Sequence, residues 1–310
     1  MKSDSVLIVG SMAFDDLELP TTRAINVLGG AATYSAYAAS LYCSSRVVAV
    51  VGDDFSESEL EALAKRGIDI TGIERVKGKT FRWVGRYSAD LSSRVTLDTQ
   101  LNVFAGFQPK LPQSYRASSF VFLANIHPAL QLQVLGQVER PKFVLADTMN
   151  FWIEGEPELL DQVLAKVDVL CVNDEEARQL SGVYPLPQAA KCILAKGPKT
   201  VLIKRGEHGC MLVDQRGIFW VPAVALNDVV DPTGAGDSFA GALIGYLASQ
   251  GNAEPDTLRR ALYVASAVAS FNVQGVGTAR LARLTARDVS QRVQNLVAMT
   301  HLVHPQESLW

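Results

Sequence analysis

The feature that most constrains the fold is a series of short apolar runs rich in β-branched residues, each bounded by turn residues. The runs are apolar throughout and do not alternate with polar residues, which is typical of strands buried on both faces of a parallel sheet. They lie at residues 6–9, 47–51, 120–123, 143–146, 169–172 and 201–203.

Segments with apolar residues at helical spacing lie between these runs, and three more such patterns fill the last third of the chain. Regular alternation of strand and helix predicts an α/β protein with a doubly wound sheet. The chain has 310 residues, of which 48% are hydrophobic, so residues 1–310 can form one large domain of this kind. The helical segments between the strands are 31–42, 57–66, 128–138, 157–165, 174–181 and 188–195.

One segment, 79–107, interrupts this alternation. Its first residues switch between apolar and polar, and the remainder is polar and rich in turn residues. This pattern predicts antiparallel strands that stand apart from the main sheet, and we expect residues 12–28 to join them. Because a small two-sided sheet is only marginally stable alone, we expect it to pack on a ligand or on a second copy of the chain.

Charge and cysteine patterns argue against several classes of protein. The formal net charge is −3 and basic residues are scattered, so there is no general attraction to nucleic acid or to an anionic membrane. No apolar stretch approaches the roughly 20 residues of a membrane span. The four cysteines lack metal-ligand spacing, which favours reduced thiols and a cytoplasmic location.

The stretch DPTGAGDSFAGALIGYLASQG, from Asp231 to Gly251, places two glycines directly before a long helical pattern. A helix N-terminus presents unpaired N–H groups and about half a positive charge, and glycine lets a ligand approach the backbone closely. Such a turn suits a nucleotide phosphate or a phosphoryl group in transfer. Asp237 would repel a bound anion unless it accepts a proton from an incoming hydroxyl group. The alternative is a plain helix start with a favourable first-turn charge.

This stretch closely resembles the C-terminal signature of the ribokinase-like (PfkB) carbohydrate kinase family. VLGGAATYSAYAASLY, followed by VVAVVGDDF, is similar to the family's glycine-pair signature, and VNDEEA and KRGEHG lie between the two in the family's order. The resemblance covers nearly the whole chain. It implies a three-layer α/β/α domain with a mostly parallel central sheet and a small β-sheet lid. It also implies an ATP-dependent kinase that phosphorylates a hydroxyl group of a sugar or nucleoside.

The resemblance assigns roles around the glycine turn. Asp237 is implied to be the catalytic base. Asp231 and Thr233 match positions that in many family members help to hold a monovalent cation, K⁺, and Thr233 also borders the nucleotide. The transferred phosphoryl group is implied to be held by the amides of Gly234, Ala235 and Gly236.

Two further motifs imply the nucleotide side of the site. Asn173 and Glu176 match the family's N-x-x-E, which implies that Glu176 holds Mg²⁺ through water; their spacing alone favours a helix-capping box. Lys204, Gly206 and Gly209 match a strand and turn that border the nucleotide. The alternative for Lys204 is a solvated surface lysine.

The substrate side is implied by residues near the N-terminus. Asp15 aligns with an acidic residue that accepts hydrogen bonds from two hydroxyl groups of a polyol or ribose, and Asp16 competes for that role. Gly29 and Gly30 match the pair that admits the substrate and hinges the lid.

The chain departs from the ribokinase pattern at two sugar contacts. Tyr34 replaces the asparagine that usually follows the glycine pair, and Ala13 replaces an asparagine ahead of Asp15. These changes favour an aromatic-lined pocket for a nucleoside or a bulkier sugar. Asn150 follows a central strand, where α/β sheets place their ligands, and is either a substrate contact or part of a strand-end turn.

Other functions and partners are also open. The chain could phosphorylate a heterocyclic alcohol such as pyridoxine. It could also be a catalytically inactive family member that binds a metabolite as a sensor, although the intact DPTGAGD argues against loss of catalysis. Arg82, Arg86 and Arg94 would either reach an anionic substrate such as a sugar phosphate or form a solvated face of the lid. Lids of related proteins pair between two copies, so we expect a homodimer, with no nucleic-acid or membrane partner.

Overall fold

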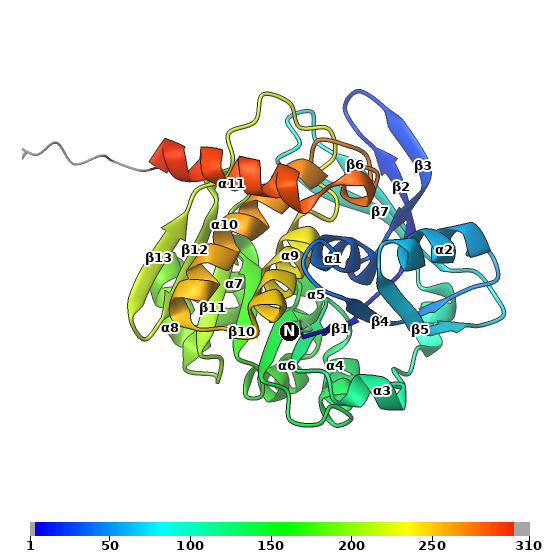
Figure 1. The fold of residues 1–310 in the computed structure, drawn as a ribbon, viewed down its shortest axis with the longest axis horizontal. Coiled ribbons are helices and arrows are strands. Elements are labelled where there is room, and N and C mark those ends of the chain that lie inside the picture. Colours follow the sequence, from blue (N-terminus) through cyan, green and yellow to red (C-terminus); the bar gives the residue numbers. More distant parts are fainter. Residues whose placement is uncertain (1–3, 301–310) are drawn as a thin grey trace, which may run out of the picture.

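A nine-stranded, mostly parallel sheet forms the centre of the protein (Figure 1). The computed structural model describes residues 4–300. The strand order is β13-β12-β11-β10-β9-β8-β1-β4-β5, and only the β11–β12 and β12–β13 pairings are antiparallel. The strands are β1 (Val6–Val9), β4 (Ser45–Val51), β5 (Ile68–Arg75), β8 (Phe120–Leu123), β9 (Phe143–Asp147), β10 (Val169–Asn173), β11 (Thr200–Lys204), β12 (Cys210–Asp214) and β13 (Gly217–Val221).

Helices cover both faces of this sheet and complete three layers (Figure 1). In residues 4–300, no helix combines the length and the apolar character that crossing a membrane requires. One face carries α1 (Ala31–Ala39), α2 (Glu57–Lys65), α9 (Ala235–Gln250), α10 (Pro255–Asn272) and α11 (Ala286–Thr300). The other carries α3 (Gln113–Arg116), α4 (Pro128–Leu135), α5 (Asn150–Gly155), α6 (Pro157–Leu164), α7 (Asp174–Ser181) and α8 (Leu186–Leu194).

The central strands are apolar throughout because each strand contributes to two hydrophobic cores. Val6 and Ile8 of β1 pack with the α1 and α9 face, whereas Leu7 and Val9 pack with the opposite face. All four side chains are fully buried, and burial of one such side chain stabilises the fold by about 1.5–3 kcal/mol. The three-layer α/β/α prediction is therefore confirmed.

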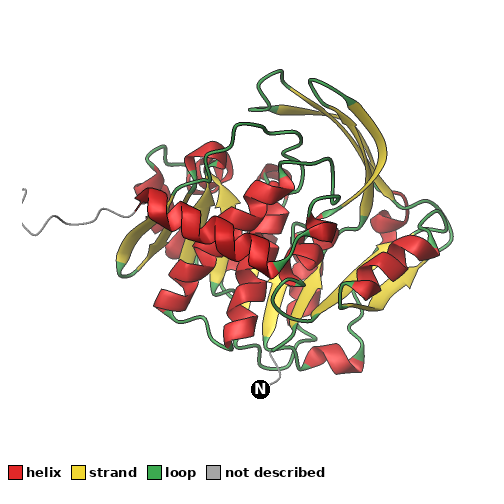
Figure 2. Ribbon diagram, turned by 45° about the horizontal axis from the view of Figure 1, so that its top comes forward, coloured by secondary structure: helices red, strands yellow, loops and turns green. Residues whose placement is uncertain are grey.

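A separate four-stranded sheet stands over one end of the main sheet (Figure 2), as the fold-class prediction required. We call it the small sheet. Its order is β3-β2-β6-β7; β6 and β7 are antiparallel, as predicted for segment 79–107, and β2 pairs with β6 in parallel. Its strands are β2 (Ala13–Glu18), β3 (Arg23–Gly29), β6 (Phe81–Tyr87) and β7 (Arg94–Gln100).

The end of the 79–107 segment differs from the prediction. Asn102–Gly106 forms a short 3₁₀ helix instead of a strand. The ring of Phe104 stacks on Phe81 and on Phe107, at centroid distances of 5.5 and 5.6 Å, and Phe107 is buried in the main domain. Aromatic packing therefore anchors this end of the segment to the main domain.

Candidate active site

Close packing of two helices positions Asp237. Helix α9 approaches α1 closely because it carries glycines where the two meet: a Cβ on Gly241 would lie 2.3 Å from the carbonyl oxygen of Ser35. A Cβ on Gly245 would lie 2.7 Å from the Cα atom of Ala39. The Ser35 hydroxyl lies 3.0 Å from the carbonyl oxygen of Asp237. The first turn of α9 is thus fixed against α1.

The turn before α9 has a conformation that needs glycine. Gly234 is the N-cap residue with φ of 73°, in the left-handed region, which is costly for residues with a Cβ. A Cβ there would lie 2.4 Å from the ring of Tyr34. Asp231 is fully buried, and its carboxylate accepts hydrogen bonds from the N–H groups of Thr233 and Gly277, both at 2.9 Å. The turn is therefore clamped from two sides.

The three predicted anion-hole amides are not equivalent. The N–H group of Ala235 donates to the carbonyl oxygen of Pro232 at 3.2 Å, so this group is engaged within the turn. Within residues 4–300, no main-chain partner is recorded for the N–H groups of Gly234 and Gly236. These two groups stand at the N-terminus of a 16-residue helix, where an anion is favoured.

Asp237 lies beside these amides and is partly exposed. Burial raises its pKa to about 6, repulsion from Asp147 adds to the rise, and attraction by Lys204 and Arg94 opposes it. A carboxylate with a pKa just below neutral is ionised at pH 7 and remains a useful proton acceptor. The side chain is thus suited to general base chemistry.

Asp15 belongs to the same electrostatic neighbourhood. Its side chain is buried on β2, and a Cβ on Gly29 would lie 2.0 Å from its carboxylate. Burial, together with the negative charges of Asp231 and Asp237, raises the pKa of Asp15 to about 8. The structure therefore gathers the predicted substrate carboxylate and the predicted base around one turn.

Replacement of Asp15 by asparagine is expected to stabilise the free protein, and more so at high pH. The pKa of Asp15 is about 8 in the folded chain, against 3.8 ordinarily, so the folded chain holds this proton more tightly. The contribution of Asp15 to the free energy of unfolding is greatest below about pH 4 and is lost as the pH rises through 8. Thermal melts without ligand should give Asp15→Asn a Tm about 3 °C or more above the parent at pH 8, with little difference near pH 4. Equal destabilisation at both pH values would contradict this prediction.

Asp16, the alternative to Asp15 for binding hydroxyl groups of the substrate, is already engaged in hydrogen bonds. Side chains alternate along a strand, and its carboxylate accepts hydrogen bonds from the N–H group of Asn26 and from Arg82, both at 2.7 Å. Arg86 is likewise paired with Glu18. Three of the four arginines of the small sheet, Arg23, Arg82 and Arg86, are therefore paired with acidic side chains of the same sheet.

Two tyrosines connect the predicted site to its surroundings. Tyr34, against Gly234, is almost fully buried, and its hydroxyl has no hydrogen-bond partner in the described residues. Burial raises its pKa well above the usual range. The hydroxyl of Tyr87, at the end of β6, lies 2.9 Å from Oγ1 of Thr233. The small sheet thus touches the turn that precedes α9.

Asn173 and Glu176 form the capping box that their spacing favours. The N–H group of Asn173 donates to Oε2 of Glu176 at 2.7 Å, and the N–H group of Glu176 donates to Oδ1 of Asn173 at 2.8 Å. Burial raises the pKa of Glu176 to about 7, while Lys204 opposes the rise and Asp147 adds to it. Capping engages only Oε2, so Oε1 is available to a water-bound cation.

Lys204 is not a solvated lysine. Its Nζ lies 2.9 Å from Oδ2 of Asp147, and the two side chains are 18% and 6% exposed. The same Nζ would lie 3.1 Å from a Cβ on Gly236, so the amine stands at the glycine turn. Sequence reasoning missed Asp147, although a carboxylate at the end of a buried apolar run was a usable signal.

The remaining predicted residues lie at turns. Gly206, with φ of 50°, and Gly209, with φ of 85°, flank the turn between β11 and β12, which the N–H of Arg205 closes by donating to the carbonyl of Gly209 at 2.8 Å. Asn150 is exposed at the first residue of α5. Within residues 4–300, no hydrogen bond joins Asn150 to the residues around Asp237.

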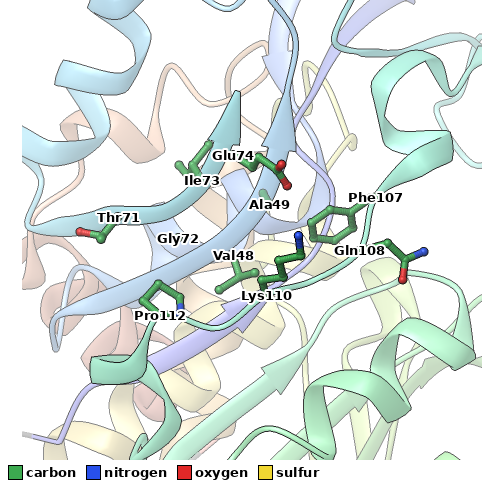
Figure 3. Close-up of a pocket in the computed structure, with 10 residues that line it drawn as sticks. All are labelled: Val48, Ala49, Thr71, Gly72, Ile73, Glu74, Phe107, Gln108, Lys110 and Pro112. Atoms are coloured by element: carbon green, nitrogen blue, oxygen red, sulfur yellow. The ribbon is translucent and has the colours of Figure 1, made fainter. Parts of the chain in front are cut away.

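A separate pocket of about 280 Å³ lies at the edge strand β5, its neighbour β4 and segment 107–112 (Figure 3). Its charged lining residues are Glu74 and Lys110, and Phe107 closes one side. None of the predicted site residues contributes to its lining.

Comparisons with known proteins identify the family of this chain. The chain matches the pfkB family carbohydrate kinase over residues 4–284. A cytidine kinase of Thermococcus kodakarensis is 29% identical over 256 residues, which cover 81% of this chain and 90% of that protein. A structure of a Burkholderia thailandensis nucleoside kinase in complex with inosine has a TM-score of 0.75 and 19% identity, covering 94% of this chain and 98% of that one. A putative ribokinase II from E. coli in complex with ATP and Mg²⁺ has a TM-score of 0.77 and 20% identity, covering 94% and 99%.

Fold, motifs and relatives together define a sugar or nucleoside kinase, a phosphotransferase whose acceptor is an alcohol. The chain belongs to the pfkB family of carbohydrate kinases, as its motifs predicted. Kinases of this family use ATP with Mg²⁺.

Proposed function

We propose that this kinase transfers the γ-phosphoryl group of ATP to a hydroxyl group of an uncharged nucleoside or sugar, with Asp237 as the general base. The observation that best supports this is the start of α9. There, the free N–H groups of Gly234 and Gly236, the amine of Lys204 and a carboxylate with a pKa of about 6 surround one turn.

In the proposed reaction, Asp15 accepts hydrogen bonds from the acceptor's hydroxyl groups, which stabilises its ionised form. Asp237 takes the proton of the attacking hydroxyl group. The oxygen of that hydroxyl group bonds to the γ-phosphorus while the bond from the γ-phosphorus to the ADP oxygen breaks. The N–H groups of Gly234 and Gly236, with the amine of Lys204, stabilise the charge on the transferred group. The proton on Asp237 then passes to solvent.

Cation binding is part of the proposal. Glu176 offers one uncommitted carboxylate oxygen beside Asn173, which fits Mg²⁺ held through water. When bound, Mg²⁺ neutralises phosphate charge. Oδ1 of Asn272 is buried without a partner in the described residues, and the amide of the same side chain donates to the carbonyl oxygen of Thr233 at 2.8 Å. This orphaned oxygen near Asp231 supports the predicted K⁺ site.

Assembly and location stay predictions. Strand β7 is an edge of the small sheet, and its residues are exposed along its whole length. An edge of this kind can pair with another strand, which supports a homodimer formed through the small sheet. A cytoplasmic location rests on the cysteine pattern alone.

The acceptor is proposed to be uncharged because the small sheet has little free positive charge to offer. Of the three arginines considered for an anionic substrate, Arg82 and Arg86 are matched by Asp16 and Glu18, and Arg94 has no ion-pair partner within residues 4–300. On the acceptor side of the turn, Asp15 holds a proton at pH 7 because its pKa is about 8, whereas Asp237 is ionised beside the buried Asp231. A phosphorylated acceptor would meet net repulsion there. The similarity to cytidine and nucleoside kinases favours a nucleoside.

A substrate panel tests the proposal. ADP release with Mg-ATP should be measured across nucleosides, sugars, sugar phosphates and pyridoxine, with mass spectrometry of the products. We expect phosphorylation of a nucleoside or free sugar, with kcat/KM at least about tenfold above that of any sugar phosphate, as a difference of about 1.4 kcal/mol implies. Preference for a sugar phosphate would contradict the uncharged acceptor. Tight binding without turnover across the panel would instead support a metabolite sensor.

A further inference from the structure

A buried ion pair lies beside the glycine turn and spans three strands of the main sheet. Asp147 ends β9, Lys204 ends β11, and β10 runs between them. Nζ of Lys204 donates to Oδ2 of Asp147 at 2.9 Å. The N–H group of Thr148 donates to the other oxygen, Oδ1, at 2.8 Å. Both carboxylate oxygens of Asp147 are therefore held in place.

Stability alone does not account for this pair. Removing two charges from water costs several kcal/mol per ion, and a buried pair often stabilises a fold no more than apolar residues would. Burial by itself would lower the pKa of Lys204, but the neighbouring charge of Asp147 holds that pKa above its usual range. Asp147 therefore keeps a buried lysine charged.

The lysine is aimed at the place where phosphoryl charge would develop. Its Nζ would lie 3.1 Å from a Cβ on Gly236, and its Cε and Cδ would lie 3.7 and 3.8 Å away. Gly236 is thus the residue that leaves room for the amine at the turn. Glu176 and Asp237 both interact electrostatically with Lys204, so the amine is the cation that three neighbouring carboxylates share.

We propose that Asp147 is a positioning residue for phosphoryl transfer: it holds the Lys204 amine at Gly236, where the amine contacts the transferred group. This inference rests on the proposed function and adds to it a residue outside the family motifs quoted above. Lys204 acts on the phosphoryl group, whereas Asp147 acts only through Lys204.

The test compares kcat and KM in three variants, with the acceptor found by the substrate panel. Lys204→Met should lower kcat about 10²-fold or more, as loss of one donor to developing charge does. Asp147→Asn should lower kcat by about 10- to 100-fold, because misplacement by about 1 Å costs that much. KM for Mg-ATP and the Mg²⁺ concentration for half-maximal rate should change by less than about threefold, which corresponds to under 0.7 kcal/mol. The double variant should be no slower than Lys204→Met alone.

A control pair lies at the opposite end of the sheet, where Asp168 directly precedes β10 and Lys199 directly precedes β11. Nζ of Lys199 lies 2.7 Å from Asp168, whose other carboxylate oxygen accepts a hydrogen bond from the N–H group of Val144. Asp168→Asn removes an Asp–Lys pair that is more exposed, with Lys199 82% exposed, at the end of the sheet away from the turn. It should leave kcat within about twofold of the parent, whatever its effect on Tm.

Three results would overturn the proposal. Asp147→Asn could lower kcat of the Lys204→Met enzyme by the same factor by which it lowers kcat of the parent, which would show that Asp147 acts independently of the lysine. It could raise the Mg²⁺ requirement at least tenfold, which would make Asp147 a metal ligand. It could also leave kcat unchanged. Asp237→Asn, assayed in parallel, tests the proposed base separately, because a fully active Asp237→Asn would contradict the proposed function without changing the relation between Asp147 and Lys204.

Discussion

Asp237→Asn is expected to lower kcat at least about 10²-fold, because loss of general base help of this kind costs 10²- to 10⁴-fold. Asparagine keeps the shape of the side chain but accepts no proton at neutral pH. The Kd for Mg-ATP should stay within about threefold of the parent, since the N–H groups of Gly234 and Gly236 are untouched. Steady-state kinetics with the identified acceptor, together with calorimetric titration of Mg-ATP, measures both quantities.

The control for this variant separates base chemistry from the effect of a first-turn charge. Asp256 is an exposed acidic residue in the first turn of α10, where a favourable interaction with the helix dipole is worth about 0.3–1 kcal/mol. Asp256→Asn should lose only that stability and keep kcat. If Asp237→Asn behaved like Asp256→Asn, the carboxylate would be a plain first-turn charge and not a base.

Gly234→Ala is expected to reduce kcat by about 10²-fold or more and also to destabilise the protein. The added Cβ would meet the Tyr34 ring at 2.4 Å, at a residue whose φ is 73°. Tyr34 is almost fully buried and has no space to retreat, so the turn must move. A displacement near 1 Å at reacting groups costs about 10²-fold in rate, and the overpacking costs about 1–3 kcal/mol in the free energy of unfolding.

The other end of the same helix supplies a matched glycine. Gly251 caps the C-terminus of α9 with φ of 68°, and a Cβ there would meet nothing within 4 Å. Gly251→Ala therefore introduces the same left-handed strain without the collision, and it should lower Tm while leaving kcat unchanged. Equal kcat in the two variants, measured at a temperature where both are folded, would contradict a role for the turn beside Tyr34.

Most of the main sheet could be predicted from the sequence because its strands are buried on both faces. Val6–Val9 and Phe120–Leu123 have the same bounds in the structure as in the prediction, since a continuous apolar run has no other place in a soluble α/β domain. Strands at the sheet edges gave a weaker signal. Strand β5 mixes buried and exposed residues, and most residues of β13 are exposed. Polar residues and glycines therefore interrupt the apolar pattern of both strands.

The candidate site could be predicted where its residues lie in one short segment. The turn from Asp231 to Asp237 could be predicted because its glycines, proline and carboxylate are contiguous. The pairing of Asp147 with Lys204 could not, because it depends on the spacing of three strands in the folded sheet. The engagement of Ala235 with Pro232 also escaped prediction, since it depends on the tight backbone path of the turn.

The most direct test of the proposed chemistry is the pH dependence of single-turnover phosphoryl transfer in the parent enzyme and in Asp237→Asn. With a pKa of about 6 for Asp237, the parent rate should fall about tenfold per pH unit below that value, because only the ionised carboxylate accepts a proton. The variant should be slow and should lack this decline. A variant that transfers the phosphoryl group at the parent rate, with the same decline below pH 6, would contradict the assignment of Asp237 as the base.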